Sequence, residues 1–437
     1  MNKFLRGRLK VVTYCGLSLA TVSGLVGCGT QANKPVTITV WTYGNYVVAP
    51  QIAQEFNSQH PGIHLVFSPI PLPPGQSSYA FVTGKLIASE LSGTAPNIIL
   101  NDQTTTAGWA SKNLLVSLNP YLKQIGVSKQ DYPSGAWASA MYQKNVYGAP
   151  VDWDPDNMLY YNIDLMKKAG ISSPPKTFNV LWTDAKKLTV KKGKSYTQMG
   201  FIPWEGYGFN VFGWAHLYGG TPQSPNGTIL LNSPAMLKSV TWEQQWAKQY
   251  GPNAIGNFLS ATPNGMDPFV DGKLAFMVTG DWELPSLQKY APNFKFGKDW
   301  GVATAPVPAG GTTDYLASGW SWVVPKKVPH LQETLKVIQW LSEPQHNADW
   351  CIGTGWIPAS NPVLKQATPM LIKKDPGFEP FIEERNLHPN LTPEFPATNN
   401  AETVEIEGTS AENEVTTLTS SPKAALNKAQ TRAKSGI

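Results

Sequence analysis

Arginine is scarce in this chain of 437 residues, and the shortage limits the partners that it can bind. Beyond the first ten residues only Arg385 and Arg432 remain, so no arginine cluster is available to bind phosphate groups. Four of the 35 basic residues lie in the first ten positions, and the other 31 nearly balance the 30 acidic residues. Nucleic-acid binding needs a positive excess, so we expect no nucleic-acid partner.

The N-terminal segment has the form of an export signal. Basic residues in MNKFLRGRLK precede the apolar stretch VVTYCGLSLATVSGLV, which is short for a membrane span. The following Leu25-Val26-Gly27-Cys28 resembles the lipobox of bacterial lipoproteins, in which cleavage leaves a lipid-bearing cysteine at the N-terminus. We predict a signal peptide over 1–27, a lipidated Cys28 and a tether over 28–36. A plain signal peptide or an uncleaved anchor are the alternatives.

Cysteine is also rare, occurring only at Cys15, Cys28 and Cys351. If the first is removed and the second is acylated, Cys351 has no partner, so no intrachain disulfide can form. We interpret Cys351 as a small buried residue.

Motifs for nucleotides, hydrolysis and zinc are missing. Gly193-Lys194-Ser195 looks like the end of a P-loop, but position 188 is leucine where the first glycine is required. Neither G-x-S-x-G nor H-E-x-x-H occurs, and the six histidines are scattered. We predict no catalytic residue, no cofactor and no metal, although a carboxylate pair of the glycosidase kind stays open.

Three aspartates alternate at Asp152, Asp154 and Asp156, as at the start of a calcium loop. An EF-hand loop needs glycine at its sixth position and glutamate at its twelfth. Here those positions are Asn157 and Ile163, so the spacing argues against calcium.

The order of predicted elements favours an α/β fold. Alternating strand, helix, strand, helix and strand in the first hundred residues indicate a parallel sheet with right-handed crossovers. Ligands of such sheets bind beyond the carboxyl ends of strands, which marks residues 42–45 and 101–103. The predicted strands are 36–41, 63–67, 97–100, 273–278 and 318–324, and the predicted helices are 50–59, 81–92, 162–168, 178–190, 234–249, 330–341 and 422–433.

Tryptophan is abundant, with 16 residues, and many lie in loops beside polar residues or glycine. A sugar ring offers an apolar C–H face to aromatic rings and a rim of hydroxyls to polar side chains. Any single tryptophan is more often a core residue, so the number of loop aromatics is better evidence for sugar binding than any one of them. The loop aromatics are Trp41, Tyr43, Trp109, Trp153, Trp204, Tyr207, Trp282, Trp320 and Trp356.

Several short motifs follow the lipobox in a characteristic order, and together they carry a resemblance. The motifs are Trp41, Phe56-Asn57, His60-Pro61-Gly62, residues 95–99 (APNII), 147–150 (YGAP), 159–162 (LYYN), Ala169-Gly170, 269–276 (FVDGKLAF), Gly280-Asp281-Trp282, Gly319-Trp320 and 355–358 (GWIP). From about Val36 onward the chain resembles the extracellular solute-binding proteins of family 1, sugar-binding lipoproteins of ABC importers related to maltodextrin-binding protein.

The resemblance implies an α/β, two-lobe periplasmic-binding-protein-like fold of type II, with a ligand cleft between the lobes. Three crossings between the lobes are expected, near 150–154, 316–320 and 349–356. The implied division is lobe 1 over 37–151 plus 318–350, and lobe 2 over 152–317 plus 351–437.

The resemblance also implies which residues line the cleft. Asp152 would lie at the hinge and accept hydrogen bonds from sugar hydroxyls, whereas Asp154 and Asp156 are interpreted as local turn formers. The expected cleft residues are Tyr43, Asn45, Asp102, Asp152, Trp153, Trp204, Asp281, Trp282, Gly319, Trp320 and Trp356.

The function implied is capture of a di- or oligosaccharide for delivery to the membrane permease of an ABC importer. The protein would act as a monomer, outside the cytoplasm, held to the outer face of the cytoplasmic membrane by its lipid. Three alternatives stay open: a binder of a non-sugar solute such as glycerol phosphate, a lipid-anchored carbohydrate-active enzyme, and a surface adhesin.

Overall fold

The computed structural model describes residues 34–436, apart from 72–77, 206–209, 263–266 and 313–314. The predicted signal peptide and Cys28 lie outside the described residues. From Pro35 onward the chain forms one compact unit. Among the described residues, no helix combines the length and the hydrophobicity needed to cross a bilayer.

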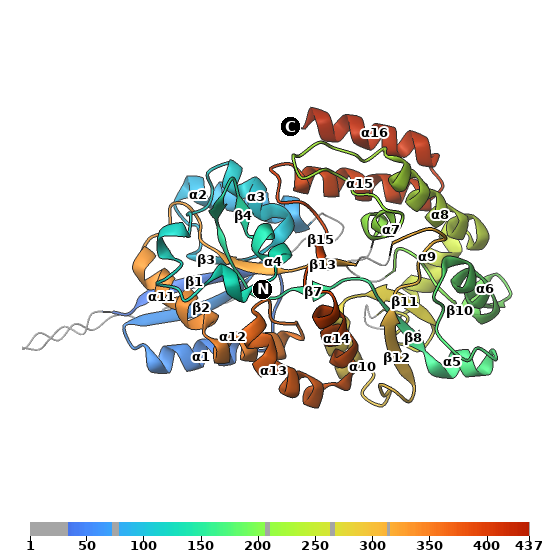
Figure 1. Cartoon of the computed structure of the whole chain (residues 1–437), viewed down its shortest axis with the longest axis horizontal. Helices are drawn as coiled ribbons and strands as arrows, with labels where there is room; N and C mark the ends of the chain where they lie inside the picture. The colour runs from blue at the N-terminus through green and yellow to red at the C-terminus, as the bar shows by residue number, and fades with distance from the viewer. Residues whose placement is uncertain (1–33, 72–77, 206–209, 263–266, 313–314, 437) are drawn as a thin grey trace, which may run out of the picture. The chain divides into compact units, whose positions relative to one another are not determined.

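The first sheet contains the predicted parallel strands, one antiparallel strand and a further strand that pairs with the antiparallel one (Figure 1). The β-branched, alternating residues after Pro35 form β1, which pairs in parallel with β2 and β3. The antiparallel strand β14 lies between β3 and β6. In spatial order the strands are β2 (Ile63–Pro69), β1 (Val36–Thr42), β3 (Ile98–Asp102), β14 (Trp320–Val323) and β6 (Gly148–Pro150).

Helices around this sheet start and stop at clear signals. Helix α1 (Ala49–Gln59) has Pro50 in its first turn, ends before Pro61 and buries Ile52 and Phe56 against the sheet core. The other helices of this region are α2 (Ser78–Ser92), α3 (Gln103–Ser111), α4 (Ser134–Ser139), α11 (Leu331–Ser342) and α12 (Pro344–Thr354), with the short turns η1 (Asn119–Tyr121) and η2 (Lys129–Asp131) and the hairpin β4 (Met141–Tyr142) and β5 (Asn145–Val146).

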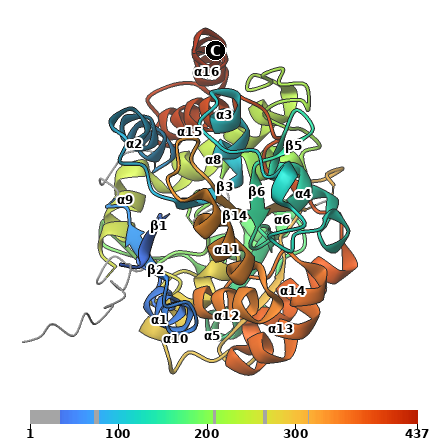
Figure 2. The same ribbon diagram turned by 90° about the vertical axis from the view of Figure 1, so that its left-hand side faces the viewer.

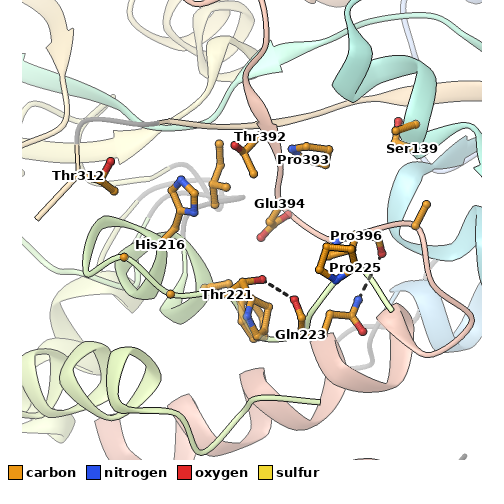
Figure 3. Close-up of a pocket in the computed structure, with 17 residues that line it drawn as sticks. Ser139, His216, Thr221, Gln223, Pro225, Thr312, Thr392, Pro393, Glu394 and Pro396 are labelled. Atoms are coloured by element: carbon orange, nitrogen blue, oxygen red, sulfur yellow. Dashed lines mark hydrogen bonds between the residues drawn. The ribbon is translucent and has the colours of Figure 1, made fainter. Parts of the chain in front are cut away.

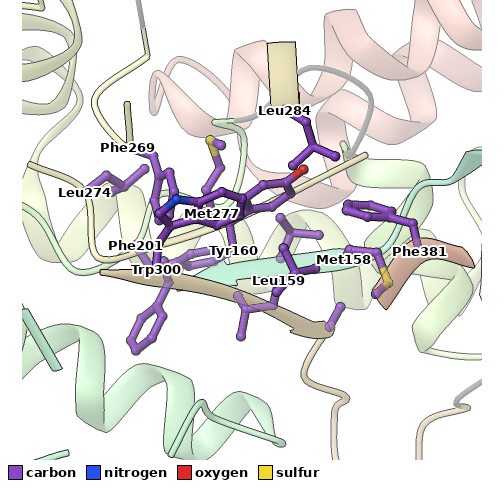
Figure 4. Close-up of a cluster of buried hydrophobic side chains, with 14 of the residues drawn as sticks. Met158, Leu159, Tyr160, Phe201, Phe269, Leu274, Met277, Leu284, Trp300 and Phe381 are labelled. Atoms are coloured by element: carbon purple, nitrogen blue, oxygen red, sulfur yellow. The ribbon is translucent and has the colours of Figure 1, made fainter. Parts of the chain in front are cut away.

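The second sheet is antiparallel and carries an aromatic core. Strand β8 (Met158–Asn162) lies between β11 (Phe276–Thr279) and β12 (Trp300–Thr304). The rings of Tyr160 and Trp300 stack with centroids 5.7 Å apart, and the Tyr160 hydroxyl donates to the Gly280 carbonyl at 2.9 Å. Figure 4 shows these two rings among the buried side chains of the region.

Most of the remaining helices and strands surround this second sheet. They are α5 (Ile163–Lys168), α6 (Phe178–Leu188), β9 (Val190–Lys192), β10 (Ser195–Gln198), α7 (Val211–Leu217), α8 (Pro234–Tyr250), α9 (Pro252–Ser260), η4 (Asp281–Glu283), α10 (Leu284–Tyr290), α13 (Asn361–Lys374), η5 (Pro376–Phe378) and α14 (Glu379–Leu387).

A small third sheet lies where the chain passes between the first two. Its strands, in the order β15-β13-β7, are β15 (Thr392–Pro393), β13 (Leu316–Ser318) and β7 (Asp154–Pro155). The segment after α12 joins it, because the Trp153 amide donates to the Ile357 carbonyl at 2.9 Å. At this point the chain passes from one hydrophobic core to another, because Trp356 packs in the core beside the first sheet and Ile357 packs in the core beside the second sheet.

Two expectations about strands need correction. The strand predicted over 318–324 is broken at Gly319, because the chain leaves the small sheet at Ser318 and enters the first sheet at Trp320. The strand predicted over 273–278 lies instead at Phe276–Thr279.

The C-terminal helices pack against both regions. Helices α15 (Ala401–Thr416) and α16 (Pro422–Ser435) lie side by side (Figure 2), and their buried residues share a core with Phe212 of α7. Helix α15 also contacts α3 beside the first sheet. The predicted C-terminal helix is confirmed, and α15 connects the surroundings of the two sheets.

Removing the Trp300 ring tests the second core. Trp300→Ala should lower the free energy of unfolding by about 3–5 kcal/mol, since a buried indole is replaced by a cavity. Urea unfolding measures this. The half-exposed Val180→Ala on α6 serves as a control and should change stability by less than about 0.5 kcal/mol. A Trp300→Ala loss as small as that of the control would contradict this account of the core.

Candidate functional site

Aromatic residues from three distant segments meet beside the crossing strands. Tyr43 follows β1, Trp320 begins β14 and Trp356 follows α12. The Tyr43 and Trp320 rings are 4.9 Å apart, edge to face, and the Trp320 and Trp356 rings are parallel at 5.9 Å. Tyr46, which the sequence reasoning missed, packs edge-on against Trp356 at 5.2 Å. The structure therefore brings the predicted residues Tyr43, Trp320 and Trp356 together with Tyr46, which was not predicted.

The segment that carries Asp152 binds the backbone of Trp320. Asp152 Oδ1 accepts a hydrogen bond from the Trp320 amide at 3.3 Å, and the Val151 amide donates to the Trp320 carbonyl at 2.8 Å. Gly319 makes this approach possible, because a Cβ at that position would lie 2.3 Å from the Asp152 carbonyl oxygen. Any larger residue at 319 would push the two crossing segments apart.

Asp281 joins Asp152 and Asp154 in a cluster of buried carboxyl groups. Burial raises the pKa of all three side chains, and the charge of Asp154 raises the pKa of Asp152 and Asp281 further. The pKa of Asp154 is raised to about 7. Asp152 Oδ2 and both Asp281 carboxylate oxygens meet no N–H or O–H donor among the described residues. A shared proton, a water or a hydroxyl of a bound solute must therefore satisfy them.

The interpretation of Asp154 and Asp156 as local turn formers is wrong. Asp154 Oδ1 accepts from the Ile357 amide at 2.8 Å, and Asp156 Oδ1 accepts from the Ser318 hydroxyl at 2.7 Å. Both side chains thus bind residues far away in the sequence and hold the crossing segments together. In the described part of the chain, no group of three or more His, Cys, Asp or Glu side chains is arranged to hold a metal ion.

Asp102 begins α3 and reaches the same aromatic group. Its carboxylate caps the helix by accepting from the Thr104 amide at 2.8 Å, and burial raises its pKa to about 6. Asp102 also accepts a hydrogen bond from Tyr79, whose ring lies 6.5 Å from Tyr43. Trp320 pairs with Asp102 across the two strands. Tyr79 was missed because no motif marks it.

The other predicted residues lie in different surroundings. Trp282 follows the second sheet yet contacts the hydrophobic core of the first, so it lies where the two regions meet. Trp204 is half-buried against the second core. Trp153 is 0% exposed and lies close to Gly135, so it offers no free face. Asn45 is exposed and lines a cavity of about 520 Å³ beside α1, together with Tyr46 of the aromatic group.

A further cavity of about 740 Å³ adjoins the crossing strands (Figure 3). Its walls come from α4, from β13 and from segments 216–225 and 392–397, and none of the eleven predicted residues is among its described lining. Glu394 extends from the last of these segments toward Thr221. Burial and then the charges of Asp156 and Asp102 raise the pKa of Glu394, which connects the cavity electrostatically to the carboxyl groups described above.

The site is predominantly acidic. Glu405 on α15 also has a raised pKa, about 8, because it is buried and lies near Asp102 and Glu402. The nearby cation is Arg385, which donates to the Ala359 carbonyl at 3.3 Å. Burial lowers its pKa to about 10 despite the nearby charge of Asp154. Such a site suits ligands that donate hydrogen bonds and disfavours anions.

Comparison with known proteins identifies the family. Residues 51–380 match a family model described as bacterial extracellular solute-binding protein. The chain belongs to this family. Its members are extracellular proteins that bind solutes. The family resemblance inferred from the motifs is confirmed.

Individual relatives of this solute-binding protein are distant. The maltodextrin-binding protein MdxE of Bacillus subtilis is 28% identical over 63% of each chain, so the match spans less than two thirds of that relative. The sn-glycerol-3-phosphate-binding periplasmic protein UgpB of Escherichia coli is 24% identical over 84% of this chain and 87% of its own.

Solved structures support the same fold. The protein CpMnBP1, solved with mannotriose bound, is 27% identical and has a TM-score of 0.80, with 91% of this chain and all of that chain covered. The α/β, two-lobe fold of type II solute-binding proteins is therefore confirmed. The exact lobe boundaries and the ligand-contacting residues remain predictions.

Protonation of Asp154 should make stability depend on pH. The folded-state pKa of about 7 exceeds the ordinary value of 3.8, so the folded protein binds this proton more tightly than the unfolded chain does. The free energy of unfolding should therefore fall as pH rises from about 4 to 7, by on the order of 4 kcal/mol at most. Asp154→Asn, which keeps the acceptor for Ile357, should remove this part of the decline in urea unfolding.

The exposed Asp164→Asn on α5 is the matched control and should leave the pH dependence unchanged. Equal pH slopes for Asp154→Asn and the unmodified protein would refute the assignment of the buried proton to this group.

Proposed function

We propose that this protein captures a di- or oligosaccharide at the crossing strands and delivers it to the membrane permease of an ABC importer. One observation carries the proposal: the rings of Tyr43, Trp320 and Trp356 pack together, and the backbone amide of Trp320 donates to the Asp152 carboxylate. Aromatic faces suit the C–H face of a sugar, and a carboxylate accepts hydrogen bonds from its hydroxyls.

The charge of the site favours a neutral sugar over a glycerol phosphate. Asp102, Asp152 and Asp281 are buried, and burial already disfavours the charged form of each, so an anionic ligand would add a further unfavourable charge to this region. Arg385, the nearby cation, already donates to Ala359 and Asn361. The relatives bound to mannotriose or named for maltodextrin agree with this choice better than the glycerol-phosphate binder does.

Delivery would depend on a hinge motion at the crossing strands. Contacts of α15 with α3 on one side and with α7 and α8 on the other link the two lobes. A sugar touching both lobes would favour the closed arrangement, because only a difference in affinity between two states shifts their equilibrium. The permease would then select the closed, loaded form. The ligand would leave chemically unchanged, since capture requires no catalysis.

Sugar binding can be tested by calorimetric titration with mannotriose, maltotriose and sn-glycerol-3-phosphate. At least one sugar should bind, and Trp320→Ala should weaken it by at least about tenfold, roughly 1.4 kcal/mol, because the aromatic face is lost. Tyr290→Ala, which removes an aromatic side chain that is 45% exposed on α10, should bind normally.

Binding of glycerol phosphate alone, or unchanged sugar affinity in Trp320→Ala, would overturn the assignment. Chromatography of the sugar after prolonged incubation distinguishes a binding protein from an enzyme, because an enzyme would release cleaved products and a binding protein would return the sugar intact.

The proposed anchor is a lipid on Cys28, with the monomeric protein held at the outer face of the cytoplasmic membrane. Several acyl chains give durable attachment, which one chain alone does not. In cells fed an alkyne-labelled fatty acid, the protein should carry the label and sediment with membranes. Cys28→Ser should abolish the label and move the protein to the soluble fraction or arrest its processing. Labelled Cys28→Ser protein would contradict the proposed site of attachment.

A further inference from the structure

A groove of about 830 Å³ lies between α6 and α8, beside the second sheet. None of the residues assigned to the sugar site at the crossing strands is among its described lining. Its volume is within the range of pockets that hold small molecules. Its lining residues lie within 178–309, entirely in the part of the chain predicted to be lobe 2.

Aromatic rings form the floor of the groove. Phe178 and Trp242 are buried and stack with centroids 4.2 Å apart, and Tyr218 meets Phe178 edge-on at 5.7 Å. Trp182 is half-buried and is held edge-on by Trp246 at 4.6 Å. Because packing already fixes these rings, a ligand that stacks on Trp182 or Tyr218 loses little affinity to side-chain ordering.

Neutral polar side chains form the rim. Asn179, Thr241 and Gln245 are exposed at the edge of the groove and offer amide and hydroxyl groups. Lys238 lies with its Nζ 5.9 Å from the centre of the Tyr218 ring. Lys186 on α6 likewise lies with its Nζ 5.9 Å from the centre of the Trp182 ring, so each half-buried ring has one lysine beside it. Among the described lining residues there is no carboxylate. No arginine is among the described lining residues to bind phosphate through two hydrogen bonds, and the other rim groups are uncharged, which favours a neutral ligand.

We propose that this groove is a second binding site, for a neutral oligosaccharide. An aromatic floor with a rim of amides and hydroxyls matches the apolar face and hydroxyl edge of a sugar ring. The groove would hold sugar without the hinge motion, because all its walls belong to one side of the crossing strands. A glycan bound there stays close to the protein and raises the local concentration of ligand for the site at the crossing strands.

The experiment is calorimetric titration of the chain from Pro35 onward with mannotriose and with maltotriose. Trp320→Ala should remove the site at the crossing strands and leave one weaker site, with a dissociation constant of about 1 mM. Adding Thr241→Arg to that variant should abolish the residual binding, because the long side chain extends over the groove from an exposed position of α8. Trp182→Ala, tested in place of Thr241→Arg, should weaken it at least about tenfold.

Tyr290→Ala is the matched control for loss of a surface aromatic residue and should leave the weaker site intact. Thermal unfolding checks that each variant is folded. If Trp182→Ala does not fold, Thr241→Arg still tests the groove. The proposal is overturned if Trp320→Ala binds neither sugar at about 10 mM, or if the residual binding survives Thr241→Arg. If only the proposed site at the crossing strands is wrong, the result differs. The unmodified protein would then show only weak sugar binding, and Thr241→Arg would remove it.

Discussion

Hydrogen bonds between buried aspartates and the crossing segments are the constraint on which the rest of the structure depends. Asp154 binds the Ile357 amide and Asp156 binds the Ser318 hydroxyl, in an interior with almost no solvent exposure. Loss of such a partner would leave a buried polar group unsatisfied, which costs more than losing a surface contact. These bonds fix where the chain passes from one sheet to the other, and so they place the residues that both sheets bring to the site.

The same constraint explains the unusual electrostatics of the region. Holding Asp152, Asp154 and Asp281 together in the buried interior raises the pKa of each and favours a shared proton. Asp152 Oδ2 and both Asp281 carboxylate oxygens meet no donor among the described residues, and Asp152 Oδ1 binds the backbone of Trp320, whose ring stacks on Trp356. The proposed sugar would match both features, because its hydroxyls would donate hydrogen bonds to the carboxyl oxygens and its apolar face would pack on the rings.

Tryptophan has two roles in this protein. Trp109, Trp214, Trp300 and Trp350 are fully buried and fill the cores, whereas Trp182 keeps part of its surface accessible at the groove. A tryptophan-rich sequence therefore indicates sugar binding only when the structure shows which rings are held by packing and still reachable. The two places proposed as sugar sites are the crossing strands, where Trp320 is half-buried, and the groove between α6 and α8.

The sequence by itself determined the family, the parallel start of the first sheet and the three crossings, because these depend on local alternation and on motifs within a few residues. It also led to the prediction of Tyr43, Asp152, Trp320 and Trp356 as cleft residues from recognisable motifs, and the structure brings these four together. Only the tertiary structure decided that Asp154 and Asp156 bind across the crossings, that Trp153 is buried, and that Tyr46, Tyr79 and Glu394 lie close by. Those outcomes depend on burial or on contacts between segments distant in the sequence, more than 160 residues apart for Asp154, Asp156, Tyr46 and Glu394, and neither leaves a pattern in the local sequence.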